Sequence, residues 1–336
     1  MCSSRFKLCL SFVLLQAAGI AASLLSVQKI TRIDNIKFEN LAIRPNGQIL
    51  TTTTKPNASV YQIDPLGILP PTLIHFIPNV KSATGIAEGR PDVFYVASGS
   101  FEIQEPAQTH PESYSITEID TRGVSLYPNG SLTRQPVIKH VANLPGASLP
   151  NGVVFARPGS ENLLVADSFR GLIWNVNVYT GDVGVALNDS TTKGVQEKGP
   201  AFTGVNGVKV YNDTLYWTNT GLNSLYKVPL DRCGNVPTGQ VPVQLASNMS
   251  CDDFAVGRQG NIYVASPQDV LFRIGSSGQR EIIAGRLVSN SSALVGPSAV
   301  RFGRLVSDRW SLYISTNGGV YAPVSGSTGI SRVDLE

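Results

Sequence analysis

The chain repeats one pattern six times, at a period of about 50 residues. Each copy starts with a polar residue, continues into a short strand of alternating apolar residues and a turn, and closes with a second apolar run, as in "NGVKVYNDTLYWTN". The opening residues are Glu39, Thr84, Asn151, Asn206, Asp252 and Ser298. A third apolar segment follows each pair, and five of these segments end at an expected turn glycine: Gly67, Gly123, Gly181, Gly234 and Gly278. Four-stranded antiparallel units at this period predict an all-β chain, a six-bladed β-propeller.

One four-stranded blade cannot bury both of its faces, so the blades are expected to close into a ring around a central channel. The leftover segment "SVQKITRI", residues 26–33, is expected to complete the last blade and to join the two ends of the chain. After residue 25 no apolar stretch has the period of a helix, and the 32 glycines and 21 prolines are typical of a chain rich in turns. A pair of β-sandwiches or a parallel β-helix would leave the period unexplained.

Residues 1–22 differ from the rest of the chain. Arg5 and Lys7 precede a short apolar stretch that ends in small residues near Ala22, which is typical of a secretory signal peptide rather than a membrane span. A buried N-terminal helix is the alternative. Residues 23–336 are then expected to form a single propeller domain in the secretory pathway or outside the cell. Cleavage would lower the formal net charge from +3 to +1, so composition gives no reason to expect nucleic acid or an anionic membrane as a partner.

Two further features agree with export. Glycosylation acceptors of the form Asn-x-Ser/Thr occur at Asn57, Asn129, Asn188, Asn212, Asn248 and Asn290. Of the four cysteines, Cys2 and Cys9 lie in the predicted signal peptide, which leaves Cys233 and Cys251. In an oxidising compartment an even pair predicts one disulfide, with two free buried thiols as the alternative.

A propeller brings the six opening residues together, because the innermost strand of each blade lines the channel and begins at its mouth. Antiparallel pairing brings the ends of the second strands to the same face, with Ser98, Asp167, Asn219, Ser266 and Asn317. A concave polar centre is where a propeller binds ligands. The candidate catalytic residues are therefore Asn151, Asn206, Thr84, Ser298, Asp167 and Asn219. Each has a structural alternative: Asn before Gly is also a turn signal, and either Asp252 or the adjacent Asp253 could face the channel.

Four of these positions suggest a cation site. Glu39, Asn151, Asn206 and Asp252 supply four oxygen donors and two negative charges, the ligand type that a hard divalent cation such as Ca²⁺ prefers. Ca²⁺ is thus the expected occupant if the four side chains converge.

The same residues carry a family resemblance. The chain resembles the propellers of the gluconolactonase and senescence-marker-protein group, whose members hold one divalent metal through a Glu, two Asn and an Asp. Glu39, Asn151, Asn206 and Asp252 match these positions in order, although the family's Glu-Gly-Pro is here "ENL" and its Asp-Gly is here "DDF". The segments "FENLAIRPNGQIL", "GVNGVKV" and "DDFAVGRQGNIYVAS" are more similar to a secreted fungal subgroup that serves secondary metabolism.

The subgroup resemblance implies a function. Some of its members are hetero-Diels–Alderases that add a tropolone-derived o-quinone methide to a terpene alkene of the humulene type, which makes a polyketide and a terpene the expected substrates. Such a reaction needs an apolar pocket and a few hydrogen-bond donors but no proton shuttle and no cofactor. The chain has only His75, His110 and His140 and no Gly-x-Ser-x-Gly motif, which disfavours zinc sites and serine hydrolases. The alternatives are a metal-dependent lactonase and a propeller that only binds ligands. Possible rim residues are Phe101, Phe169, Arg170, Trp217 and Tyr321, with Trp217 expected in the core.

Overall fold

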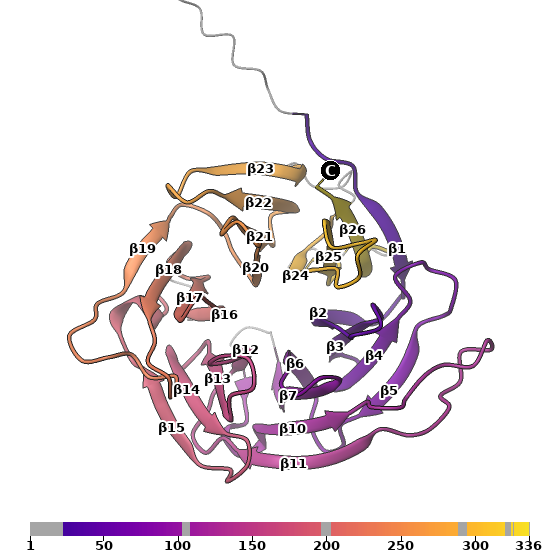
Figure 1. The fold of residues 1–336 in the computed structure, drawn as a ribbon, viewed down its shortest axis with the longest axis horizontal. Helices are drawn as coiled ribbons and strands as arrows, with labels where there is room; N and C mark the ends of the chain where they lie inside the picture. The colour runs from indigo at the N-terminus through magenta and orange to yellow at the C-terminus, as the bar shows by residue number, and fades with distance from the viewer. Residues whose placement is uncertain are drawn as a thin grey trace, which may run out of the picture.

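A computed structural model describes residues 23–335 except 103–107, 196–202, 288–293, 320–323 and 325. Its strands form six four-stranded antiparallel sheets arranged as blades in a ring, which Figure 1 shows along the axis of the ring. The predicted six-bladed β-propeller is therefore confirmed. Residues 1–22 lie outside the described residues, so the signal peptide and the boundary at residue 22 stay predictions.

The strand order within the blades runs outward from the channel. The first blade consists of β2 (Lys37–Ile43), β3 (Ile49–Lys55), β4 (Ser59–Ile63) and β5 (Thr72–Phe76). The second consists of β6 (Ser82–Glu88), β7 (Val93–Gly99), β10 (Ser115–Asp120) and β11 (Val137–Asn143). The third consists of β12 (Pro150–Phe155), β13 (Asn162–Asp167), β14 (Leu172–Asn177) and β15 (Val183–Leu187).

The other three blades follow the same order, and the last one closes the ring. The fourth consists of β16 (Val205–Tyr211), β17 (Thr214–Asn219), β18 (Ser224–Pro229) and β19 (Val243–Ala246). The fifth consists of β20 (Phe254–Val256), β21 (Ile262–Ser266), β22 (Val270–Ile274) and β23 (Arg280–Gly285). The sixth consists of β24 (Pro297–Phe302), β25 (Ser311–Thr316), β26 (Gly329–Asp334) and the N-terminal β1 (Gln28–Arg32), which pairs with β26 as predicted.

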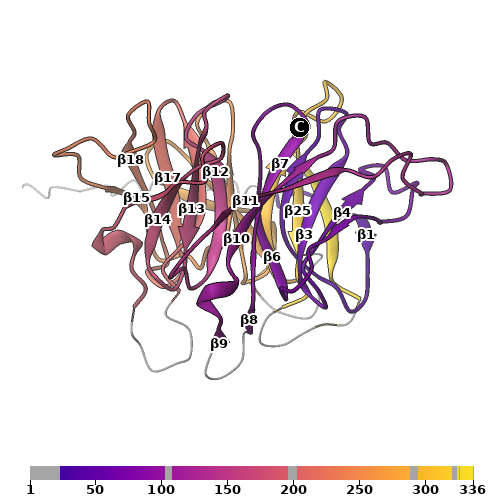
Figure 2. The same ribbon diagram turned by 90° about the horizontal axis from the view of Figure 1, so that it is seen from below.

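A small hairpin and two short turns complete the described structure. The hairpin consists of β8 (Phe101–Glu102) and β9 (Gln108–Thr109), and Figure 2 shows it at one face of the ring. Helical geometry in the described ranges is limited to two three-residue 3-10 turns, η1 (Pro111–Ser113) and η2 (Ser190–Thr192). No helix among these residues has the length and apolar character needed to cross a bilayer.

The six innermost strands share one direction, because each begins at or beside one of the opening polar residues. Two ends of the channel follow from this arrangement. We call the end at which the inner strands begin, with Glu39, Asn151, Asn206 and Asp252, the acidic mouth. We call the opposite end, at which the inner strands finish, the basic mouth, after Arg90, Arg157 and Arg304 in the wall of the cavity described below.

Neighbouring blades approach one another closely at the three glycines that directly follow an opening residue. A Cβ on Gly85 would lie 2.1 Å from the main-chain oxygen of Asn151, and one on Gly152 would lie 2.6 Å from that of Asn206. A Cβ on Gly207 would lie 2.4 Å from an oxygen of Asp253. The repeated Asn-Gly is thus not only a turn signal, because its Gly lets the next inner strand pack against it.

Glycines also make the turns between outer strands, as the sequence predicted. Each of the five takes a positive φ, which costs glycine little because it has no Cβ. The values are +68° at Gly67, +74° at Gly123, and +80° at Gly181, Gly234 and Gly278.

The core is divided among the spaces between blades. In one of these clusters Leu164 and Ala166 of the third blade pack with Val208 and Trp217 of the fourth. Trp217 is fully buried and stacks on Tyr226 with ring centroids 5.6 Å apart, so its expected place in the core is confirmed.

The predicted disulfide between Cys233 and Cys251 does not form, and both thiols are free. Cys251 is buried beside the start of β18, where its Sγ lies 3.6 Å from the main-chain oxygen of Ser224. Cys233 is exposed in the turn that follows the other end of this strand. A six-residue strand is about 20 Å long, and a disulfide needs Cα atoms within roughly 7 Å. The prediction was wrong because two cysteines that flank one blade lie at its opposite ends.

The glycosylation acceptors were predicted to lie on the surface. Every one in the described ranges has an exposed asparagine: Asn57, Asn129, Asn188, Asn212 and Asn248. Asn290 lies outside the described residues. Glycosylation itself stays a prediction.

Candidate functional site

The acidic mouth gathers carboxylates from two blades. Glu39 belongs to β2, and Asp252 immediately precedes Asp253 and β20. Burial raises the pKa of Glu39 to about 7, assisted by the nearby charge of Asp253 and opposed by Lys37. Burial also raises the pKa of Asp252 well above its usual range, and repulsion from Glu39 and then from Asp253 adds to this effect. The two carboxyl groups therefore lie close enough to repel one another and lack full compensation by cations.

Asn206, at the start of β16, lies beside Asp252, and hydrogen bonds fix the orientation of its side-chain amide. Its Nδ2 donates to Oγ1 of Thr220 at 3.0 Å, and that hydroxyl donates onward to the main-chain oxygen of Cys251 at 2.9 Å. Because the Thr220 hydrogen is already used, its oxygen must accept from the Asn206 amide. The opposite atom of the amide, Oδ1, is buried and has no hydrogen-bond partner.

Asn151 occupies the equivalent position in the third blade. Its Nδ2 donates to Oγ of Ser168 at 3.3 Å. The amides of Asn151 and Asn206 are therefore each held by a hydroxyl near the end of the second strand of their own blade.

Glu39, Asp252 and Asn206 together fit a hard cation, and the place of Asn151 in this set stays a prediction. Two carboxyl groups that repel one another and a buried amide oxygen without a partner are a donor set that a divalent ion would satisfy. No three His, Cys, Asp or Glu side chains gather into a metal site anywhere in the described ranges, so a cation here would also need amide oxygen ligands.

The hydroxyls of Thr84 and Ser298 join neighbouring blades. Thr84 Oγ1 donates to the main-chain oxygen of Pro150 at 2.8 Å, which links the second blade to the third. Ser298 Oγ donates to the main-chain oxygen of Glu39 at 2.6 Å, which links the sixth to the first. Both hydroxyl hydrogens are thus used within the ring, and their predicted catalytic role stays a prediction.

Asp167 and Asn219, at the ends of β13 and β17, hold loops. The carboxylate of Asp167 accepts from the main-chain N–H groups of Ser148 and Leu149, both at 2.9 Å, and from the indole of Trp174 at 3.1 Å. Nδ2 of Asn219 donates to the main-chain oxygens of Thr191 and Lys193 at 2.9 and 2.8 Å. Neither side chain is therefore free to point into the channel.

The aromatic and basic rim candidates differ in exposure. Phe101 is buried, Phe169 is half-buried and Arg170 is exposed. Tyr321 lies outside the described residues. All three histidines lie away from the inner strands: His75 is on β5, His140 is on β11, and His110 precedes η1.

Below the acidic mouth lies an ion cluster that sequence reasoning missed. Asp253, only 1% exposed, forms an ion pair with Nζ of Lys209 and a second one of 3.0 Å with Arg301. Its carboxylate also accepts from Nδ2 of Asn40 at 3.0 Å and from the N–H of Phe254 at 2.7 Å. The question left open by "DDF" is thereby answered: Asp252 lies with Glu39 and Asn206, and Asp253 belongs to this cluster.

A local irregularity explains why Lys209 and Arg301 were missed. Each stands three residues after an opening residue, Asn206 or Ser298, and ordinary strand alternation would turn it away from the channel. The pairing register shifts between Val205 and Val208, and again just after Pro297. Such an irregularity interrupts the alternation of side chains between the two faces of the strand, so that residues three apart can share a face.

The cluster perturbs its own charges. Burial and the positive charge of Arg301 lower the pKa of Lys209 to about 7, although Asp253 opposes this shift. Burial alone would raise the pKa of Asp253, but Arg301 and Lys209 lower it overall. The carboxylate therefore stays ionised between two basic groups.

Comparisons with known proteins place this geometry in context. No protein-family model matches the chain. A Phoma sp. protein named "Putative hetero-Diels-Alderase" is 28% identical over 301 residues, which cover 83% of each chain. A Sarocladium schorii protein of the same name is 25% identical over 308 residues, which cover 83% of this chain and 74% of that protein.

A solved structure agrees on the fold. It belongs to a "putative gluconolactonase", superimposes with a TM-score of 0.60 over 92% of both chains, and is 13% identical. The predicted resemblance is confirmed. The chain is similar in sequence to proteins named as hetero-Diels–Alderases and in structure to gluconolactonase-like six-bladed propellers.

Proposed function

We propose that this protein catalyses a hetero-Diels–Alder addition in secondary metabolism, joining a tropolone-derived o-quinone methide to a terpene alkene of the humulene type. The observation that carries the proposal is the match to two relatives of that name over 83% of the chain. The match extends over most of the propeller and thus includes much of the channel.

The chemistry suits a site without a proton shuttle. The four-atom heterodiene O=C–C=C of the quinone methide adds to the C=C bond of the alkene, which forms one C–O and one C–C bond. All atoms are retained, and no proton, electron pair or leaving group departs. The position of every histidine on an outer strand or loop is compatible with this reaction class.

The protein would contribute orientation and polarisation. Holding both reactants in a near-attack geometry can supply several kcal/mol of the barrier, about 7 or more in favourable cases. A hydrogen bond to the quinone methide oxygen makes the heterodiene more electron-poor as the C–O bond forms. Asn151 is the preferred donor, because one Nδ2–H is engaged with Ser168 and the amide has a second N–H to give.

Asn206 and the carboxyl groups would shape the other side of the mouth. The Asn206 amide donates a hydrogen bond to Asp252, which favours the ionised form of that carboxyl group. The Asn206 amide therefore has fewer N–H groups left to donate to a substrate than the Asn151 amide has. A divalent cation bound by Glu39, Asn151, Asn206 and Asp252 would act as a Lewis acid on a substrate carbonyl. The cycloaddition does not require one.

A metal-dependent lactonase is the second candidate. The unpartnered Oδ1 of Asn206 beside two carboxyl groups of raised pKa favours it, because this donor set fits a cation. Chelation separates the two functions: it should abolish lactone hydrolysis and leave a cycloaddition in place.

The test uses the purified chain with a quinone methide precursor and humulene, beside a panel of simple lactones. We expect a faster reaction and a single stereoisomer of the adduct. Asn151→Ala should lower the rate of the addition and its stereoselectivity. Asn143→Ala, on the outer strand β11, is the matched control. Lactone turnover without any change in adduct yield or stereochemistry would favour the lactonase instead.

A further inference from the structure

The basic end of the channel contains a cavity. Its volume is about 680 Å³, within the range of roughly 300–1,000 Å³ typical of small-molecule sites. Apolar side chains from the far ends of five inner strands make most of its wall, among them Ala42, Ala87, Val154, Phe155, Val210 and Phe302. Nothing in the function proposed above uses this space.

The inner end of this cavity carries a surplus positive charge. Lys209 and Arg301 both line the cavity, whereas Asp253, the one carboxylate that they share, does not. Their side chains are only 13% and 17% exposed, so water screens them weakly. Below about pH 7, where Lys209 keeps its proton, two cations and one anion leave a net charge of about +1 facing an otherwise apolar chamber.

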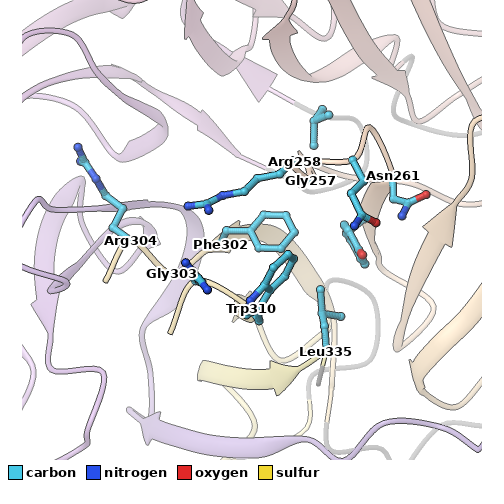
Figure 3. A pocket seen from close by; sticks show the side chains of 12 residues that line it. Gly257, Arg258, Asn261, Phe302, Gly303, Arg304, Trp310 and Leu335 are labelled. Carbon is cyan, nitrogen blue, oxygen red and sulfur yellow. The ribbon is translucent and has the colours of Figure 1, made fainter. Parts of the chain in front are cut away.

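The outer rim of the cavity is basic as well. Arg90, Arg157 and Arg304 line it, and among the described lining residues only Glu88, which pairs with Arg304, is acidic. A neighbouring pocket of about 380 Å³ shares Phe302 and Arg304 and adds Arg258 and Arg309, and none of the described residues that line it is acidic. In Figure 3 the side chain of Arg258 extends across this pocket above the ring of Phe302.

Charge and shape together select the ligand class. We propose that the cavity at the basic mouth binds an apolar organic acid, with its carboxylate against Lys209 and Arg301 and its hydrocarbon body along the apolar wall. A neutral ligand would leave the surplus charge uncompensated, and a cation would be repelled by it. A polyanion would have to leave most of its charge against apolar side chains, which is costly.

This site is separate from the one in the proposed function. The ion cluster of Asp253, Lys209 and Arg301 lies between the cavity and the acidic mouth, and neither Glu39 nor Asn151 lines the cavity. The inference therefore holds whether or not the protein is a cycloaddition catalyst.

Calorimetric titration of the full chain at pH 6, where Lys209 is protonated, can test the inference with three probes of equal length: octanoate, 1-octanol and octyltrimethylammonium. Charge-assisted hydrogen bonds are roughly twice as strong as neutral ones, so octanoate should bind at least about tenfold more tightly than the alcohol. The ammonium probe should bind most weakly. Equal affinity for the acid and the alcohol, or no binding of octanoate, would overturn the proposal.

Two variants locate the binding. Lys209→Met leaves Asp253 paired with Arg301 alone, and should weaken octanoate at least about fivefold without affecting the alcohol. Lys139→Met, on the exposed strand β11, is the matched control. Ala87→Phe should narrow the chamber and weaken the binding of all three probes, which keeps the test informative even if Lys209→Met folds poorly. Octanoate binding unchanged in either cavity variant would contradict the proposal.

Discussion

Gly152 of the third blade and Asn206 of the fourth lie so close that a Cβ on the glycine would be 2.6 Å from the main-chain oxygen of Asn206. The same Asn206 carries the amide whose Oδ1 is buried without a partner at the acidic mouth. Packing between blades and placement of the candidate site thus depend on the same contact.

Gly152→Ala should therefore destabilise the protein. Because the contacted atoms are main chain and cannot rotate away, we expect a loss of about 1–3 kcal/mol in the free energy of unfolding. Gly184→Ala is the matched control: Gly184 lies on β15 with no atom within 4 Å of the added Cβ. Urea denaturation measures both variants. An equal effect at the two positions would mean that this close approach does not limit the packing.

Lys209 should make stability depend on pH. Its pKa is lowered from 10.5 to about 7, so between these values the unfolded chain holds one proton more than the folded one. The free energy of unfolding should therefore rise with pH across this window, by at most about 1.4 kcal/mol per pH unit. Below pH 7 Lys209 is protonated in both states, so it should no longer make stability depend on pH. The pKa of Asp253 is lowered, so its carboxylate stays charged throughout the window.

The difference between the wild type and Lys209→Met isolates this effect, since other titrating groups are common to both. Denaturation at a series of pH values from 6 to 10.5 should show the wild type gaining stability relative to the variant. A constant difference across this range would show that the pKa of Lys209 is not lowered.

The two cysteines should react very differently with a thiol reagent. Cys233 is exposed and should be modified in the native protein. Cys251 is buried, and burial, together with the charge of Asp252, raises its pKa to about 12, so it should react only after denaturation. A titration that finds no free thiol in denatured, unreduced protein would contradict the free state of both cysteines.

Much of the fold followed from the sequence because its signals are local and repeated. The opening residues and the turn glycines recur at a fixed period, and the segment at 26–33 completes the last blade. A chain with such a repeat has few ways to bury its apolar residues. The cysteine pair failed because proximity in sequence does not tell which end of a blade a residue occupies.

The candidate site was harder to predict. Glu39, Asn206 and Asp252 could be inferred to converge, because they occupy equivalent positions in the repeat. Lys209 and Arg301 could not, because an irregularity in strand register has no mark in the residue pattern. The Ser298 hydroxyl donates its hydrogen to the main-chain oxygen of Glu39. This bond also depends on how neighbouring blades meet, which the repeat alone does not specify.

The measurement that most directly tests the proposed function is the stereochemical outcome of the addition. Purified protein, treated with a chelator and then incubated with the quinone methide precursor and humulene, should give the adduct faster and as one stereoisomer. The uncatalysed mixture should give several. Asn151→Ala should reduce the selectivity, by up to about 1–3 kcal/mol at the transition state. An adduct distribution identical with and without the wild-type protein would contradict the proposed function.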